Sequence, residues 1–423
     1  MKGPIYRAAP NYVMISDPKY IHEAHKWNRS DWFVTLDPQV GMQSTGTART
    51  MEQHNQMRRR IAPAYNPDSM YEMESKLDKS LVEFQETLRT RFAVSGKICN
   101  IGDYIHWFAF DAVMDLAFSH RIGFVKEGKD VGLIIHSLLA LFDTLRFLTT
   151  YPGLQKFINH KWVAPILSSK PTDDSGPGLM AIKEVQRRLK HGSSGNKKDL
   201  LDRFIEYKNE RGVGIPPREL EVDAFTPIIA GPESVATLLR AAVLYIVTNP
   251  RVHQKLTAEL DEKELSGSLS TPISYQETKQ LPYLCAVVKE MFRIHPPIGT
   301  PFPRVVPQEG ITICGHFIPG GCDVGRNKQI FGDDVDRFRP ERWLEATRDE
   351  LREFQRADLT FGAGLTTCLG KHIAAFEIHK TLAELFRNFH VEMANPIHPC
   401  EIDNMFAFLF HDMNVYLSLR STG

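Results

Sequence analysis

The sequence has no uninterrupted apolar stretch long enough to cross a membrane. A spanning helix needs about 20 consecutive, predominantly apolar residues, and no run in the 423 residues reaches that length. Residues 1–10 also lack the apolar core of a secretory signal peptide. We therefore expect neither a membrane anchor nor a signal peptide in the chain as written.

Excess charge and paired cysteines are also missing. The 51 basic and 51 acidic residues cancel, so a nucleic acid is a disfavoured partner. The six cysteines are spread thinly, without the spacing of a disulfide framework or of a zinc site, which suits a reducing compartment. With 42% hydrophobic and 24% charged residues, the composition is that of an ordinary globular protein.

Apolar periodicity predicts a mainly helical chain with small β-sheets near both ends. Helices are expected at 51–118 (broken near 63–67 and 95–97), 131–160, 179–190, 198–211, 217–248 and 281–293, with 179–190 facing solvent. A further helix is expected at 17–26, an irregular loop at 33–50, and connectors at 168–178 and 191–197. Strands are expected in 4–16 and 294–325. Alternation across Phe406, Phe408 and Phe410 and then Val415, Leu417 and Leu419 predicts a terminal hairpin.

The most informative segment is 358–377. Phe361, Gly362 and Gly364 open a loop, Cys368 lies near its end, and a helix is expected to start at about Leu369. A cysteine before a helix start faces unpaired N–H groups and the positive end of the helix dipole, which favours the thiolate. Glycines without a β-carbon would let the backbone, including Gly370, approach a flat ligand. A lone buried cysteine is more often an inert small hydrophobe, but one soft anionic ligand beside a planar partner is also the arrangement of an axial haem thiolate.

The string Phe361-Gly-x-Gly364-x-x-x-Cys368-x-Gly370 closely resembles the haem-binding loop of the cytochrome P-450 family, the haem-thiolate monooxygenases. The resemblance extends from about Tyr6 to Arg420. It implies the mainly α fold of that family, with residues 1–423 as one haem-enclosing catalytic domain. It also implies haem b as the cofactor, with Cys368 as the axial ligand of the iron.

Two further motifs fit the same family. Glu290 and Arg293, three residues apart, share a helical face, and Arg342 follows in Phe338-Arg-Pro-Glu-Arg342-Trp343. By themselves they would form an ordinary surface ion pair, whereas the resemblance implies a buried structural network of Glu290, Arg293 and Arg342 behind the haem loop.

The run Ala230-Gly231-Pro232-Glu233-Ser234 lies inside an expected helix, where proline costs about 3 kcal/mol. Such a run would either break the helix or kink it. The family resemblance implies an oxygen-binding groove here, with Glu233 as the acid that relays protons and Ser234 as the hydroxyl donor in place of the more usual threonine.

His54 and Arg58 stand four apart on one helical face, either as part of a solvated basic helix or as a grip on a charged group. The resemblance implies that His54, Arg58 and Arg304 bind the haem propionates. Two departures stand out. Thr366 occupies a position where the family usually has a basic residue, and about seven residues are missing after Gly325.

The resemblance is greatest to filamentous-fungal members used in secondary metabolism. It implies insertion of one oxygen atom from O₂ into an organic substrate, facing Ile228, Ile229, 298–302 and Phe406. Electrons would come from NADPH through a separate reductase, because the chain has no dinucleotide fingerprint. The expected location is the cytoplasm or the endoplasmic reticulum surface. A haem-thiolate isomerase or dehydratase and a non-catalytic haem-binding remnant stay open as alternatives.

Overall fold

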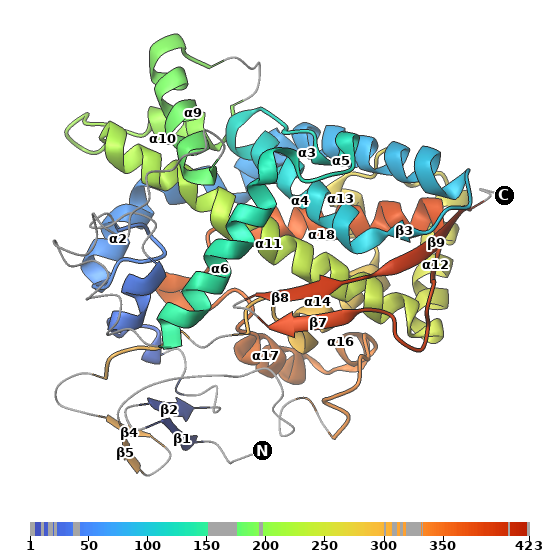
Figure 1. Ribbon diagram of the computed structural model, residues 1–423. Helices are drawn as coiled ribbons and strands as arrows, with labels where there is room; N and C mark the ends of the chain where they lie inside the picture. The colour runs from blue at the N-terminus through green and yellow to red at the C-terminus, as the bar shows by residue number, and fades with distance from the viewer. Residues whose placement is uncertain are drawn as a thin grey trace.

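The protein is described here from a computed structural model. It describes residues 5–9, 12–15, 20, 23–36, 43–150, 176–193, 198–299, 302–306, 311–313, 316–318, 331, 333–404 and 407–420. These residues form a mainly helical body with small antiparallel sheets, which confirms the predicted fold class (Figure 1). The segment after Gly325, most of 17–22, the connector 168–175 and Phe406 lie outside the described residues.

Most helices follow the predicted boundaries, but the helix expected at 198–211 ends at Glu206 and the loop expected at 33–50 begins inside a 3-10 helix. The end of the helix expected at 131–160 lies outside the described residues, and the helices Pro250–Leu265 and Arg348–Ala357 were not predicted. In chain order the helices are η1 (Asp31–Leu36), α2 (Met51–Ile61), η2 (Ala62–Tyr65), α3 (Pro67–Leu88), η3 (Arg89–Ala93), α4 (Ile101–Phe118), α5 (Phe124–Glu127), η4 (Val131–Leu133), α6 (Ile134–Thr150), α9 (Pro177–His191), α10 (Leu200–Glu206), α11 (Pro217–Val247), α12 (Pro250–Leu265), α13 (Tyr275–Thr278), α14 (Pro282–Ile294), α16 (Arg342–Glu345), α17 (Arg348–Ala357), η5 (Gly364–Thr366) and α18 (Lys371–Asn388). The expected break near 63–67 is a restart: Asn66 accepts a hydrogen bond from the Ser69 N–H, and Pro67 begins α3.

The strands form four small sheets. They are β1 (Ile5–Ala9), β2 (Tyr12–Ile15), β3 (Cys99–Asn100), β4 (Ile311–Ile313), β5 (His316–Ile318), β6 (Phe389–Met393), β7 (Glu401–Asn404), β8 (Phe408–His411) and β9 (Asn414–Leu419). The pairs are β1–β2, β4–β5 and β7–β8, and the fourth sheet has the order β3-β9-β6. In Figure 1 the β1–β2 and β4–β5 pairs lie together below the helical body.

The predicted terminal hairpin is wrong. β8 pairs with β7, whereas β9 pairs with β3 and β6, so the two tail strands belong to different sheets. Between them Asp412 takes a positive φ of 53° and Met413 is fully buried. A chain that reverses by a short turn would normally pair the flanking strands. Here burial of Met413 and Val415 directs β9 to the other sheet instead.

The prediction that helix 179–190 faces solvent is also wrong for one side of it. α9 packs against α11, and Ala181, Val185 and Arg188 are buried. The Arg188 guanidinium lies between the carboxylates of Asp199 and Asp202, at 3.0 and 2.5 Å. The sequence did not indicate this buried face, because charged residues are usually exposed and nothing in the sequence shows that Arg188 has two carboxylate partners.

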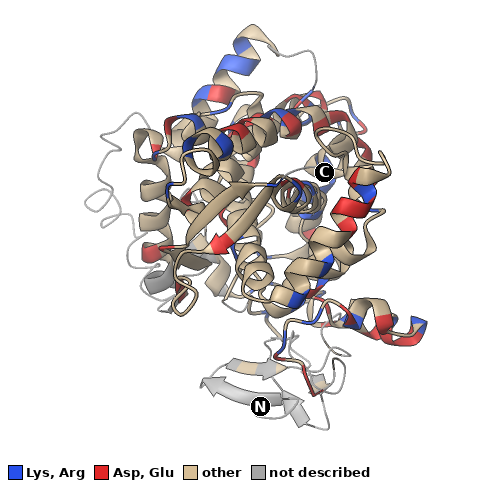
Figure 2. Cartoon of the chain, turned by 90° about the vertical axis from the view of Figure 1, so that its right-hand side faces the viewer, with Lys and Arg blue, Asp and Glu red and all other residues tan. Residues whose placement is uncertain are grey.

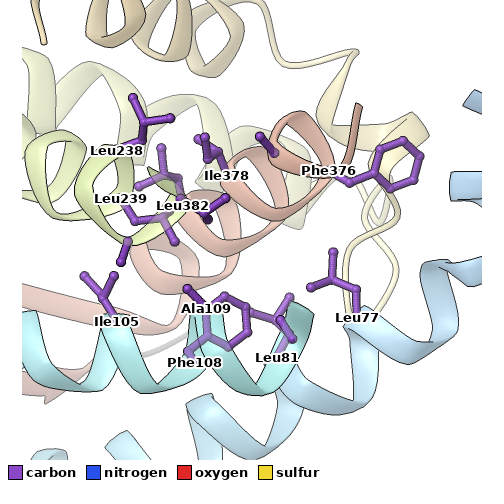
Figure 3. Close-up of a cluster of buried hydrophobic side chains, with 14 of the residues drawn as sticks. Leu77, Leu81, Ile105, Phe108, Ala109, Leu238, Leu239, Phe376, Ile378 and Leu382 are labelled. Carbon is purple, nitrogen blue, oxygen red and sulfur yellow. The ribbon is translucent and has the colours of Figure 1, made fainter. Parts of the chain in front are cut away.

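The core lies where α3, α4, α11 and α18 meet. Figure 3 shows Leu81 of α3 and Phe108 of α4 packed near Leu239 of α11 and Leu382 of α18. α11 makes its largest contact with α4 and also packs on α18 and α14. The central position of α11 and α18 therefore places both segments with sequence motifs inside the body of the protein.

Helix α11 continues through Pro227 and Pro232 without interruption. Among the described residues it is the one helix long and apolar enough to cross a membrane, and 67% of its apolar window is buried inside the protein. Its composition is explained by its place in the core. On the outer helices, acidic and basic residues are interspersed (Figure 2), consistent with the balanced composition.

Candidate haem-thiolate site

The loop before α18 holds Cys368 in a fixed backbone position. The Cys368 N–H donates to the Phe361 carbonyl at 2.7 Å, which closes the loop, and the Phe361 ring packs edge-on against Phe292 of α14. Gly362 and Gly364 have φ angles of +70° and +57°, which only glycine adopts at low cost. The loop is thus shaped by two glycines and anchored on α14.

Gly370 has a different role from these two glycines. Its φ is −74°, and a β-carbon there would lie 3.8 Å from the Cys368 Sγ, an ordinary contact. Gly370 also caps α18, and its N–H and that of Lys371 point at the sulfur. The helix therefore begins two residues later than predicted, and its first amides face the thiol.

The expected low pKa of Cys368 is wrong for the protein chain alone. Burial raises the pKa of the thiol, and the two amides, Arg58 and Lys371 offset this only in part. A bound metal ion would deprotonate the thiol outright. The same residue is nevertheless exposed. The sulfur is thus surrounded by protein groups and is still accessible to a ligand, as the thiolate ligand of a flat cofactor must be.

Three arginines gather beside this loop. Arg58 donates to the Thr367 carbonyl at 2.6 Å, and Arg304 to the Thr366 hydroxyl at 3.3 Å. Arg29, which the sequence analysis missed, is buried next to both, and burial together with their charges lowers its pKa to about 9. Among the described residues no carboxylate forms an ion pair with any of the three. One buried and two half-buried cations without anions indicate a site for an anionic ligand.

His54 lies at the same place but brings no charge. Its side chain is buried, and its Nδ1 is 3.3 Å from the Asn55 side-chain oxygen. Burial and the neighbouring arginines lower the pKa of His54 to about 4. At neutral pH it therefore offers a neutral hydrogen-bonding ring.

The structure brings Glu290, Arg293 and Arg342 into one buried cluster. The Arg293 guanidinium grips the carboxylate with Nε and Nη2 at 2.9 and 2.8 Å, and Arg342 Nε donates at 3.0 Å. The Trp343 indole N–H and the Arg339 backbone N–H also donate to the same carboxylate. Phe292, on the same helix, accepts a hydrogen bond from Thr360 in the Cys368 loop. The cluster thus fixes the helix on which that loop rests.

Glu233 and Ser234 point to different neighbours on α11. The Glu233 carboxylate is buried, 2.7 Å from the His106 Nε2 on α4 and 3.7 Å from Arg240. The His106 ring and the Arg240 guanidinium keep the pKa of Glu233 below its usual value although burial opposes them. The Ser234 hydroxyl donates to the carbonyls of Ala230 and Gly231 at 2.8 and 3.0 Å. His106 had no signal in the sequence, because one histidine in an apolar helix is usually a core residue.

The described residues fit a haem well. An accessible thiol stands at the end of a loop shaped by two positive-φ glycines. Arginines without carboxylate partners lie beside the same loop, where they could bind the two carboxylates of a haem. The features define a haem-thiolate protein.

Comparison with known proteins supports the same class. The sequence model of the cytochrome P-450 family matches residues 3–419. A cytochrome P-450 monooxygenase of Aspergillus terreus is 34% identical over 412 residues, which cover 92% of this chain and 83% of the relative. Cytochrome P-450 monooxygenase mfmA of Annulohypoxylon moriforme and cicH of Emericella nidulans are each 32% identical. They align with 99% of this chain and with 85% and 87% of their own lengths.

This chain belongs to the cytochrome P-450 family. It is a haem b-binding oxidoreductase that uses O₂, an organic substrate and a redox partner.

Proposed function

We propose that this monooxygenase oxidises a small organic molecule in fungal secondary metabolism, with electrons from NADPH supplied by a separate cytochrome reductase. The fungal relatives named as monooxygenases support this placement. The observation that carries the reaction type is the enclosed, accessible thiol of Cys368 beside three arginines without carboxylate partners. The four cysteines recorded in the described residues are free, which fits a cytoplasmic or endoplasmic reticulum surface location.

In this proposal the Cys368 sulfur would hold the iron, and Phe361, Gly362, Gly364 and Gly370 would bring the backbone of the loop against the cofactor. When bound, the haem would supply an iron whose thiolate ligand favours O–O cleavage. His54, Arg58 and Arg304 would hold the propionates. His54 acts as a neutral donor, while the two arginines contribute charge.

We assign proton delivery to Glu233 and Ser234. The Ser234 hydroxyl donates to the carbonyls of Ala230 and Gly231. A rotation of the Ser234 side chain would free this proton for donation to another acceptor. Glu233 is the nearest ionised carboxylate along the helix, and His106 is its contact toward α4. A proton that arrives at His106 Nε2 can pass to Glu233 across 2.7 Å and onward by rotation of the carboxylate. The presence of both an acid, Glu233, and a hydroxyl, Ser234, supports oxygen activation over the isomerase or dehydratase alternative.

The reaction is tested with purified full-length chain, a fungal NADPH–cytochrome reductase and ¹⁸O₂, against a panel of apolar aromatic and terpenoid compounds. The expected result is a product that gains one ¹⁸O atom and depends on NADPH, reductase and O₂. A product formed without NADPH or O₂ would indicate the isomerase or dehydratase alternative. A chain that binds haem but consumes no NADPH with any compound would favour the non-catalytic remnant.

A further inference from the structure

Helix α2 has few buried residues to hold it in place. Of its 11 residues only His54 and Ile61 are buried, and Ile61 is the last of them. Most of the stability of a helix in a protein comes from packing an apolar face against its neighbours. The position of α2 therefore depends on the polar contacts of its side chains as well as on packing.

Two arginines of α2 contact two different parts of the site. Arg58 donates to the Thr367 carbonyl at 2.6 Å, next to Cys368, and its charge favours the thiolate form of that cysteine. Arg60 contacts α11 instead, with its Nε 2.7 Å from the Asp223 carboxylate. Residues two apart in a helix point to nearly opposite sides of it. Helix α2 thus forms a bridge between the Cys368 loop and α11.

Asp223 is the inner end of this bridge. Its side chain is fully buried, and among the described residues Arg60 is the one cation that pairs with it. Burial raises the pKa of Asp223 to about 6 and Arg60 limits the rise, so the group is ionised at neutral pH. Glu219, one turn earlier, pairs with the same guanidinium but is exposed. A buried ion pair adds little net stability, because the desolvation of two charges offsets their attraction. The Asp223 contact therefore serves mainly to fix the position of Arg60 on α11.

We propose that Asp223 is a positioning residue for the thiolate site: it anchors Arg60 on α11, so that α2 holds the Cys368 loop in place through Arg58. The proposal rests on ligation of the iron by Cys368, and not on the substrate or the electron donor. Without the anchor, α2 can shift together with Arg58. The loop then loses one of the hydrogen bonds that hold its backbone beside the thiol.

The test replaces both members of the buried pair, so that no unpaired charge is left in the core. Arg60→Met/Asp223→Leu exchanges the ion pair for apolar side chains of similar size, which often leaves stability unchanged. Full-length proteins loaded with haem b are compared by their rate of haem loss to excess apomyoglobin. The red-shifted Soret band of the reduced carbon monoxide complex reports thiolate ligation, and urea unfolding measures stability.

We expect Arg60→Met/Asp223→Leu to lose haem roughly fivefold to tenfold faster than wild type, the effect of losing one hydrogen bond to a charged group. Its unfolding midpoint in urea should stay close to that of wild type. An unchanged rate of haem loss, with the red-shifted band present in wild type, would overturn the anchor alone. A wild type without that band would refute ligation by Cys368, and the proposal with it.

The same substitutions in an Arg58→Met chain separate positioning from a general effect on the fold. Arg58→Met alone should also lose haem faster than wild type. Adding Arg60→Met/Asp223→Leu should change that rate by less than about twofold, because the anchor acts through Arg58. Equal acceleration in both backgrounds would overturn the proposal. Glu221→Gln is the control, since Glu221 lies two residues before Asp223 on another face of α11 and should leave the rate unchanged.

Arg60→Lys provides the same comparison if the double variant does not accumulate as folded protein. Lysine keeps the charge but lacks the planar fork with which Arg60 contacts Asp223 and Glu219 together. It should lose haem severalfold faster than wild type and should add little to the effect of Arg58→Met. Haem loss at the wild-type rate would contradict the proposal, and so would equal acceleration in the two backgrounds.

Discussion

Glu377 is a carboxyl group buried in α18 with neither oxygen bonded to a partner. Burial raises its pKa from 4.5 to about 8, so folding favours the neutral acid. The stabilising contribution of the neutral form is fully present below pH 4.5 and is lost as the pH rises to about 8. Glu377 therefore makes the fold sensitive to alkali.

Glu377→Gln should remove this sensitivity. We expect its free energy of unfolding to match that of the wild type near pH 5 and to exceed it by roughly 3 kcal/mol near pH 8.5, since each unit of pKa shift corresponds to about 1.4 kcal/mol. Urea unfolding at the two pH values measures the difference. A constant gap between the two proteins across this range would contradict the raised pKa.

Glu233 is the residue through which the proposed proton route enters α11. Glu233→Gln keeps the shape of the side chain but removes the acid, and we expect product formation to fall by at least ~10-fold. NADPH should still be consumed, so the product formed per NADPH falls as well. The control is Glu206→Gln, an exposed residue that pairs with Lys198. Unchanged product per NADPH in Glu233→Gln would assign Glu233 to the structure of the core alone.

At the scale of elements, the Cys368 loop depends on backbone conformations that glycine permits. Gly362→Ala places a β-carbon at φ +70° and should cost roughly 1–2 kcal/mol of unfolding free energy, with reduced haem content. For the unfolding free energy, Gly370→Ala is the matched control in the same loop, because its φ is −74° and the added β-carbon meets the Cys368 Sγ only at 3.8 Å. Equal losses for both variants would show that space rather than backbone strain limits the loop.

The cluster around Glu290 joins α14 to the segment before α16. Glu290→Gln leaves the buried Arg293 guanidinium without its anion and Arg342 with Asp334 alone, and we expect a loss of about 3–5 kcal/mol in unfolding free energy. Exposed Glu353, 3.8 Å from Arg356, provides the control, and Glu353→Gln should stay within about 0.5 kcal/mol. A small effect of Glu290→Gln in the same urea titration would mean that the cluster adds little to stability.

The ends and buried faces of helices were predictable from the sequence where residues close in the chain determine them. Asn66 and Pro67 fix the start of α3, and the apolar stripe of 281–293 fixes the buried face of α14. The tail hairpin was predicted wrongly because strand alternation reveals the face of a strand and not its partner. The buried side of α9 was missed because the pairing of Arg188 with Asp199 depends on the packing of α10.

At the scale of the whole molecule, motifs far apart in sequence meet around one enclosed site. Cys368, Arg58 and Arg304 were predictable because they belong to recurring strings. Arg29 and His106 were not, since Arg29 is placed by a backbone bridge to Arg304 and His106 by the packing of α4 on α11. Such residues are defined by long-range contacts, which a single sequence does not reveal.

The same packing explains why α11 has the composition of a membrane helix. It lies against α4, α9, α14 and α18, so its apolar residues are covered on several sides by other helices. Glu233 and Arg240 are accommodated there because they pair with His106 and with each other. The helix thus holds paired polar side chains inside an otherwise apolar core.

The central claim is that the Cys368 sulfur ligates the haem iron, and the reduced carbon monoxide spectrum tests it most directly. Wild type and Cys285→Ala, which removes a half-buried cysteine on α14, should both give the strongly red-shifted Soret band of thiolate ligation. Cys368→Ala should lose that band. A Cys368→Ala protein with unchanged haem content and an unchanged carbon monoxide spectrum would contradict the account.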